Sequence, residues 1–254
     1  MKIFCTKMKT VIGTISLSLV AILLASLVAI TNTGTVYFGW AKRLVPIYSV
    51  QTTEKKVALT FDAAWGSDKT AKIVSTLQEN GVSGTFFLVG FWVEQNADKV
   101  KLIDDAGFDI GTHSNTHPKM STLSSEQVKN ELTKSMELIT NITGKEVKFF
   151  RAPFGDYNDN LISIAGSLGL KTIQWDVDSL DWKGLSAEEI LTRIKNSVKN
   201  GSIILCHNNS DHILEALPLI ISYLKSEGYS MVKISDLVYN DNYIIDNNGL
   251  QKLK

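Results

Sequence analysis

The sequence predicts an α/β fold whose largely parallel sheet is covered by helices on both faces. From Lys55 onward, short apolar runs alternate with longer amphipathic stretches. Several of the short runs are apolar on both faces, which is typical of strands buried on both sides of a parallel sheet. Strands alternating with helices between residues 54 and 238 indicate an α/β barrel or a doubly wound sheet, and periodicity alone does not separate the two.

Seven apolar runs are the predicted strands: 57–62, 84–90, 108–113, 147–151, 170–176, 202–207 and 230–234. The stretches between them are predicted to be helices. Two of these begin with a capping box, in which a serine precedes a glutamine or glutamate by three residues: Ser124 with Gln127, and Ser186 with Glu189. Glycines follow the helical stretches, where a left-handed residue is needed; they are Gly81, Gly107, Gly144, Gly201 and Gly228.

A long uncharged segment precedes this domain. Residues 11–30 contain no charged side chain, and a helix of this length spans about 30 Å, the hydrocarbon thickness of a bilayer. Three lysines precede the segment, and no clear A-x-A cleavage site follows it. We therefore expect a transmembrane signal anchor with the following domain outside the cytoplasm. The alternative is a buried helix of a soluble protein.

The zero net charge is the sum of two unlike parts. Residues 1–53 carry five basic side chains and no acidic one, which leaves 21 of the 26 basic residues against all 26 acidic residues in positions 54–254. Because a nucleic-acid-binding protein normally has a strongly basic balance, this class is excluded. With 44% hydrophobic residues and only two cysteines, Cys5 and Cys206, the chain is neither disordered nor a disulfide scaffold.

The chain therefore divides into five parts. These are a basic cytoplasmic end (1–10), the anchor (11–30), a linker with a lead-in strand (31–53), the α/β domain (54–238) and a polar tail (239–254). The tail is polar enough to be loosely ordered. The sequence does not indicate an oligomeric state.

Five chemically capable side chains stand at or just past the carboxyl ends of five predicted strands. They are Asp62, His113, Arg151, Asp178 and His207. In α/β folds the carboxyl ends of the strands carry the chemistry, since they meet at one edge of the sheet. Each residue alone is more simply a satisfied core group or a cap. Five together predict a functional site.

Two patterns near these strand ends each have a functional and a structural interpretation. His113 and His117 have the four-residue spacing that places two imidazoles on one side of a helical turn, which suits a divalent metal, although this spacing alone is a weak signal. Cys206 precedes His207 and suggests a thiol–imidazole pair. Side chains alternate along a strand, however, so Cys206 points to the opposite face and is predicted to be a small packed residue.

Five segments resemble, in order and spacing, the five motifs of the polysaccharide deacetylases of carbohydrate esterase family 4. The segments are TFDAAW (60–65), HSNTH (113–117), RAPFGDYN (151–158), DSLDW (178–182) and ILCHN (204–208). The resemblance covers about residues 54–238 and implies a NodB-homology domain, which is a distorted (β/α) barrel with about seven parallel strands. The FDAAWG variant, the HNN sequence and the single anchor are most similar to the PdaB-type, sporulation-associated branch.

The resemblance implies a role for each matching residue. Asp62 would be the general base that takes a proton from the attacking water, and Arg151 would pair with it. His207 would be the general acid, paired with Asp178. His113 and His117 would hold a divalent metal, with zinc the expected ion. The substrate-binding residues would be Trp182, Leu205, Pro153 and Tyr157, the first two around the acetyl methyl group.

These roles agree with what hydrolysis of an N-acetyl group requires. A metal acidifies water and polarises the carbonyl. A guanidinium keeps a carboxylate ionised, as a base must be, and a carboxylate keeps an imidazole protonated, as an acid must be. The implied substrate is peptidoglycan or a related N-acetylated glycan of the cell wall or spore cortex, and the enzyme would be a membrane-anchored hydrolase acting outside the cytoplasm.

One departure from the family pattern weakens the metal site. The first motif normally has two adjacent acids, the second a metal ligand, and here that position is Ala63. Two imidazoles are fewer than the three protein ligands usual in a catalytic zinc site. Asp62 itself, Asn115 or waters are the possible remaining ligands. Asn208, where many relatives have an acid, is a milder departure.

Three functions of different classes follow. The first is an N-deacetylase of peptidoglycan amino sugars, and Ala63 favours the second, a non-catalytic glycan-binding or morphogenetic protein on the same fold. The third is an O-acetyl esterase using the same site. The aromatic residues near the motifs, Trp65, Phe154 and Tyr157, suit either stacking against sugar rings or packing.

Overall fold

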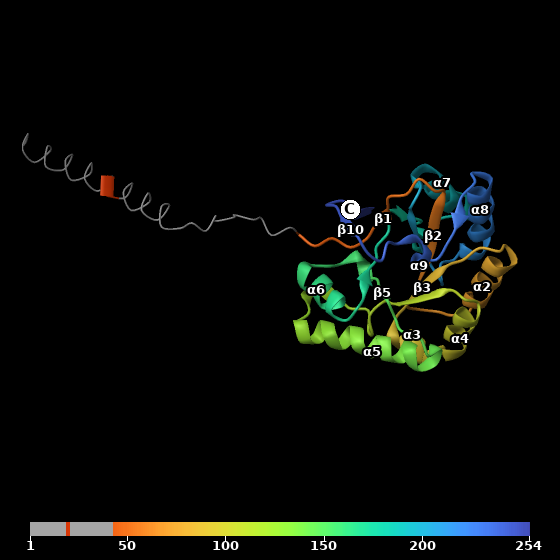
Figure 1. Ribbon diagram of the computed structural model, residues 1–254. Coiled ribbons are helices and arrows are strands. Elements are labelled where there is room, and N and C mark those ends of the chain that lie inside the picture. The colour runs from red at the N-terminus through yellow and green to blue at the C-terminus, as the bar shows by residue number, and fades with distance from the viewer. Residues whose placement is uncertain (1–18, 21–42) are drawn as a thin grey trace, which may run out of the picture. The chain divides into compact units, whose positions relative to one another are not determined.

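A parallel sheet forms the centre of residues 43–254 in the computed structural model, which describes residues 19–20 and 43–254 (Figure 1). Its strands run in the order β6-β5-β4-β3-β2-β8-β7, and β9 pairs with the start of β2. Their bounds are β2 (Lys56–Ala63), β3 (Thr85–Leu88), β4 (Asp109–Thr112), β5 (Phe149–Phe150), β6 (Lys171–Thr172), β7 (Val177–Asp178), β8 (Ile203–His207) and β9 (Ser230–Met231).

The strand order decides between the two predicted architectures. β6 and β7 are neighbours in the chain but stand at opposite ends of the strand order, so the sheet curves into a parallel half-barrel. All seven predicted strands are present, which confirms the α/β prediction. β7 is a further short strand just beyond the run 170–176.

Helices cover the outside of this sheet. They are α2 (Thr70–Glu79), α3 (Gly90–Gln95), α4 (Ala97–Asp105), α5 (Ser125–Thr143), α6 (Asp159–Ser167), α7 (Ala187–Ser197) and α8 (Ile213–Ser226). The short helix α9 (Ile234–Leu237) belongs instead to the apolar cluster inside the half-barrel. Helices α6, α5, α4, α2, α8 and α7 pack on one another in that order, which follows the order of the strands beneath. Both predicted capping boxes are present, at the starts of α5 and α7.

Alternation along β2 separates the core from the site. Val57, Leu59 and Phe61 belong to the apolar layer between sheet and helices, and all three are fully buried. Thr60 and Asp62 lie on the other face, toward the interior of the half-barrel. The lower interior is filled by a second apolar cluster that includes Ala58, Phe87, Ile47, Ile173 and Ile203. The strands therefore present Asp62 above a closed apolar floor.

The predicted membrane anchor, residues 11–30, lies outside the described residues apart from Leu19 and Val20, which are helical and exposed. In the part of the chain that the structure describes, no helix is long and apolar enough to cross a membrane. Cys5 also lies outside the described residues.

The C-terminal tail is ordered, contrary to the sequence prediction. Strands β10 (Tyr243–Ile245) and β11 (Leu250–Leu253) form an antiparallel hairpin, and β11 pairs in parallel with the lead-in strand β1 (Ser49–Val50). Gln251 in β11 is fully buried and bonds the backbone of Tyr239 through both ends of its amide. Figure 1 shows the C-terminus beside β1 and β10.

Gly201 joins this small sheet to the half-barrel at a position that only glycine fits. Its φ is 79°, and a Cβ there would overlap the carbonyl oxygen of Val50. We expect Gly201→Ala to lower the free energy of unfolding by at least about 2 kcal/mol, measured by urea unfolding. Gly81→Ala is the matched control, since φ is 62° but no atom lies within 4 Å of the added Cβ. Equal losses in the two variants would contradict the steric explanation.

Candidate active site

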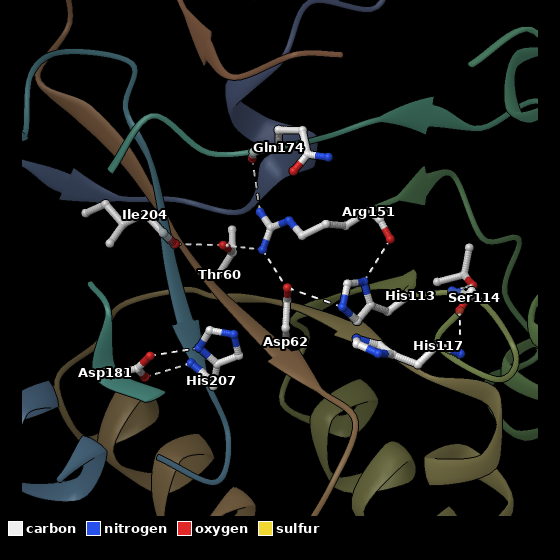
Figure 2. A network of polar contacts seen from close by, with 11 residues as sticks. Thr60, Asp62, His113, Ser114, His117, Arg151, Gln174, Asp181, Ile204 and His207 are labelled. Carbon is white, nitrogen blue, oxygen red and sulfur yellow. Dashed lines mark hydrogen bonds and ion pairs between the residues drawn. The ribbon is translucent and has the colours of Figure 1, made fainter. Parts of the chain in front are cut away.

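A buried ion pair occupies the carboxyl end of β2. One Nη of Arg151 donates to Asp62 Oδ1 at 2.7 Å and to Thr60 Oγ1 at 2.9 Å, while the other donates to the carbonyl oxygen of Gln174 at 3.2 Å (Figure 2). Arg151 is fully buried, with its guanidinium 4.1 Å from the ring centroid of Phe87. The predicted pairing of Arg151 with Asp62 is confirmed.

The charges around Asp62 keep its carboxylate ionised. Burial raises the pKa of this carboxyl, but the positive charge of Arg151 and its hydrogen bond to the carboxylate outweigh burial and lower the pKa below its usual value of 3.8. Asp62 is therefore an anion at neutral pH with one oxygen held by Arg151. This is the state that a general base requires.

His113 lies directly after β4 and faces Asp62. Its Nδ1 is 2.8 Å from the carbonyl oxygen of Arg151, an arrangement in which Nδ1–H donates, so Nε2 carries the lone pair. Nε2 lies 3.5 Å from Asp62 Oδ2. Burial lowers the pKa of His113 below 6.5. The neutral imidazole therefore points its lone pair toward the carboxylate.

His117 approaches His113 through an irregular loop rather than the helical turn expected from the spacing. The two ring centroids are 4.9 Å apart, and Ser114 and His117 both have positive φ, 70° and 58°. Glu131 of α5 holds this loop, because its carboxylate accepts from the backbone N–H groups of Asn115 and Thr116 at 2.9 and 2.8 Å. Burial lowers the pKa of His117 to about 4.

His207, at the end of β8, is paired with Asp181 and not with Asp178, so that predicted pairing is wrong. Asp181 Oδ1 is 2.7 Å from His207 Nδ1, and Oδ2 accepts the backbone N–H of His207 at 2.8 Å. The physical reason is a backbone reversal at Leu180, where φ is 50°. That turn directs Asp181 at the imidazole and leaves Asp178 to accept the backbone N–H of Leu180 at 2.9 Å.

The surroundings of His207 shift its pKa upward, whereas those of Asp62 shift its pKa downward. Burial lowers the pKa of His207, but the hydrogen bond and the charge of the fully buried Asp181 outweigh burial and raise the pKa above 6.5. The same carboxylate holds the imidazole in one orientation with Nε2 free to carry a proton. Two titratable groups with opposite environments in one site are typical of an acid–base pair.

A cleft of about 490 Å³ brings these groups together. It is lined by Asp62, Ala64, Trp65, His113, His117, Phe154, Trp175, Asp178, Trp182, Leu205, His207 and Asn209. Trp182 and Leu205 lie where the sequence predicted. Pro153 and Tyr157 do not line the cleft: Pro153 is buried in the turn η2 (Pro153–Gly155), and Arg43 lies 5.4 Å from the ring of Tyr157. That turn presents Phe154 instead.

Cys206 is fully buried among the apolar residues on the opposite face from His207, as predicted, and burial raises the pKa of its thiol. This side chain takes no part in the site. Backbone strain, in contrast, is concentrated around the cleft. Four non-glycine residues of the site loops have positive φ: Ser114, His117, Phe154 and Leu180. Such conformations persist where the surrounding structure enforces them, and they accompany functional sites.

The described residues provide too few donors for the metal site that the resemblance implies. Within residues 43–254, no group of three or more His, Cys, Asp or Glu side chains could hold a metal ion. Asn115, a possible third ligand, packs its side chain against Gly90 and does not line the cleft. The imidazoles of His113 and His117 are suitable donors, but the set does not fit the usual three-ligand catalytic site.

The fold and the cleft define a class of protein: an acid–base hydrolase built on a parallel α/β half-barrel. The family model described as polysaccharide deacetylase matches residues 49–173. The chain is also 32% identical over 204 residues to a peptidoglycan-N-acetylglucosamine deacetylase of Bacillus cereus, covering 79% of this chain and 74% of that protein. The chain belongs to the polysaccharide deacetylase family, a family of hydrolases that act on N-acetyl amide bonds.

The solved structures include relatives with and without activity. Wild-type BA3943, described as a CE4 family pseudoenzyme from Bacillus anthracis, gives a TM-score of 0.74 at 37% identity and covers 76% of this chain and 68% of its own. A BA3943 mutant with restored enzymatic activity gives a TM-score of 0.74 at 38% identity, covering 76% and 71%. The chain spans 60% of the length of YlxY, an uncharacterised protein of Bacillus subtilis to which it is 34% identical over 76% of this chain.

Proposed function

We propose that this chain is a peptidoglycan N-deacetylase that removes acetyl groups from amino sugars. The observation that carries this proposal is that Asp62 and His207 line one cleft, the carboxylate of Asp62 held by Arg151 and the imidazole of His207 held by Asp181, which raises its pKa. Membership of the family and the similarity to a named peptidoglycan-N-acetylglucosamine deacetylase support the substrate class.

The chain's own residues divide the reaction between them. Asp62 Oδ2 takes a proton from the water that attacks the acetyl carbonyl carbon, while Arg151 keeps the carboxylate ionised and fixed. As the C–N bond breaks, His207 Nε2 donates a proton to the departing amine nitrogen. Acetate and the free amino sugar are the products. Trp182 and Leu205 provide apolar surface for the acetyl methyl group.

The proposed place of action is outside the cytoplasmic membrane. The support comes from the sequence: residues 11–30 are uncharged over a membrane-spanning length, and lysines precede them. On this proposal the anchor holds the domain against cell-wall glycan, or against spore cortex glycan as in the branch that the motifs resemble.

A second candidate function is a non-catalytic glycan-binding or morphogenetic protein. Ala63 favours it, because the donor set of the described residues is one ligand short of the usual site. The similarity to BA3943, which is described as a pseudoenzyme, points the same way. The two candidates share the cleft and differ in turnover.

Acetate release by the full-length chain separates these functions. We expect release from an N-acetylglucosamine oligomer or from peptidoglycan, and none from the same glycan after N-deacetylation. Release only from O-acetylated glycan would select the esterase that uses the same site. Glycan binding without acetate release from either substrate would overturn the deacetylase proposal in favour of the second candidate.

The pH dependence tests the acid assigned to His207. Activity requires ionised Asp62 and protonated His207, so it should persist down to the lowered pKa of Asp62 and fall as the pH rises through the raised pKa of His207. Asp181→Asn removes the hydrogen bond and charge that raise the latter pKa. We expect the alkaline limb of the activity profile to move down by at least about one pH unit.

Asp178→Asn is the matched control for this experiment. Asp178 lines the same cleft, but its charge is the last of the causes that raise the pKa of His207. The alkaline limb should therefore move much less than in Asp181→Asn. A larger shift in Asp178→Asn would support the predicted pairing of His207 with Asp178 and would contradict its pairing with Asp181.

A further inference from the structure

Exposed aromatic side chains gather on the cleft. Among the described residues, the exposed tryptophan and phenylalanine side chains are Trp65, Phe154 and Trp182, at 58%, 63% and 59% exposure, and all three line this cleft. Large exposed apolar groups in one place mark binding surfaces. Trp65 and Phe154 both contact His117, with ring centroids 5.0 and 4.6 Å from the imidazole.

The turn that carries Trp65 is held by two buried donors. Trp92 Nε1 of α3 and Asn208 Nδ2 both donate to the carbonyl oxygen of Gly66, at 2.7 and 2.8 Å. Trp92 and Asn208 are 2% and 1% exposed. The residue after Trp65 is thus bound from two sides, so the exposed indole stands on a fixed backbone.

Asn208 connects this turn to the catalytic strands. Its backbone N–H donates to the carbonyl oxygen of Asp62 at 3.1 Å, and its Nδ2 also reaches Thr70 Oγ1 at 3.2 Å. The amide is essential to this arrangement, because a carboxylate at the same position has no N–H to offer the Gly66 carbonyl. This gives a physical reason for asparagine at position 208.

Trp65 stays 58% exposed beside its two ring contacts. Its packing partners are Phe91, at 6.2 Å between ring centroids, and His117. A pyranose ring with equatorial substituents presents a face of C–H groups, which is apolar and matches a flat aromatic surface. A platform that is already fixed loses little conformational entropy when it binds. The acidic balance of residues 54–254, 21 basic against 26 acidic residues, also makes capture of anionic wall polymers by charge unfavourable.

We propose that Trp65 is a stacking platform for a pyranose ring of the glycan strand, next to the amino sugar whose acetyl group is removed, and that Asn208 is the positioning residue that holds it. This rests on the proposed glycan substrate and adds a subsite on the His117 side of the cleft. Trp182, which follows the His207 partner Asp181 in the chain, lines the same cleft.

Equilibrium binding tests this subsite without requiring turnover. The probe is a β-1,4-linked N-acetylglucosamine tetramer, titrated calorimetrically into the full-length chain in detergent. We expect Trp65→Ala to weaken binding about tenfold or more, Trp65→Phe to weaken it less, and Leu219→Ala, an exposed apolar residue outside the cleft, to leave it unchanged. Binding by Trp65→Ala that equals the parent would overturn the platform.

A double variant tests whether Asn208 acts through Trp65. Asn208→Asp should weaken tetramer binding, and adding Asn208→Asp to Trp65→Ala should weaken it little further, because the platform is already gone. Thermal unfolding identifies any general loss of structure in the Asn208 variants. Fully additive effects in a folded double variant would overturn the positioning role.

The outcome separates this inference from the proposed function. Weakened binding in Trp65→Ala together with no acetate release by the parent keeps the platform and rejects the deacetylase. Acetate release by the parent together with unchanged binding in Trp65→Ala keeps the deacetylase and rejects the platform.

Discussion

Asp62→Asn is expected to reduce acetate release by about 10²- to 10⁴-fold, the range typical for loss of a general base. Asparagine has nearly the same shape and can still accept the hydrogen bond from Arg151, so the geometry of the cleft is retained. Its amide cannot take a proton from water. The measurement is the initial rate of acetate release at saturating N-acetylglucosamine oligomer, where a loss of binding does not contribute.

The same substitution has a cost in stability that must be separated from the loss of catalysis. Arg151 is fully buried, and without the Asp62 carboxylate its charge is uncompensated, which destabilises by about 3–5 kcal/mol. The double variant Asp62→Asn/Arg151→Met removes both charges and should recover much of this stability. Its activity should stay as low as that of Asp62→Asn. A double variant that regains both stability and activity would exclude Asp62 as the base.

Much of the fold could be predicted because local and long-range requirements agree in this chain. Strand β2 must be apolar on one face to pack against helices, and Val57, Leu59 and Phe61 satisfy this alternation. The capping boxes at Ser124 and Ser186 satisfy backbone donors within a few residues. In both cases the signal and the interaction lie in the same short segment.

The prediction for the tail was wrong for the converse reason. Residues 239–254 look polar as a segment, but β11 is stabilised by pairing with β1, about 200 residues earlier in the chain. Gln251 is buried because the backbone of Tyr239 satisfies its amide. No local pattern carries that information, since it depends on which distant segments meet.

The site residues also divide into those that the sequence could predict and those that it could not. Asp62, His113, Arg151 and His207 could be predicted because the ends of parallel strands converge, whatever the loops do. The choice between Asp178 and Asp181 depended on a single φ at Leu180, for which leucine gives no signal. The motif DSLDW contains both acids, and the prediction chose Asp178, whereas the structure pairs His207 with Asp181.

Ala63→Asp is the second large-effect prediction, and it tests why the metal donors are incomplete. Ala63 is fully buried at the end of β2, directly after Asp62 and before Ala64, which lines the cleft. The family resemblance places the missing acid here. A carboxylate at this buried position is costly unless a cation compensates it, so the variant should unfold at a lower temperature than the parent in chelator.

Added zinc should reverse that loss, because a cation shared by the introduced carboxylate, His113 and His117 compensates the new charge. Linkage predicts about 2.7 kcal/mol of stabilisation once free metal reaches about 100 times its dissociation constant. We expect metal content by elemental analysis and acetate release to rise together, each by about tenfold or more.

Ala64→Asp is the matched control, since it adds the same carboxylate to the cleft one residue later. Zinc-dependent stabilisation should belong to Ala63→Asp alone. If Ala64→Asp gains metal and activity instead, the position that lacks the metal-ligating acid is 64 and not 63. If neither variant changes its metal content, the incomplete donor set is not what limits the site, and the two imidazoles serve some purpose other than holding a metal.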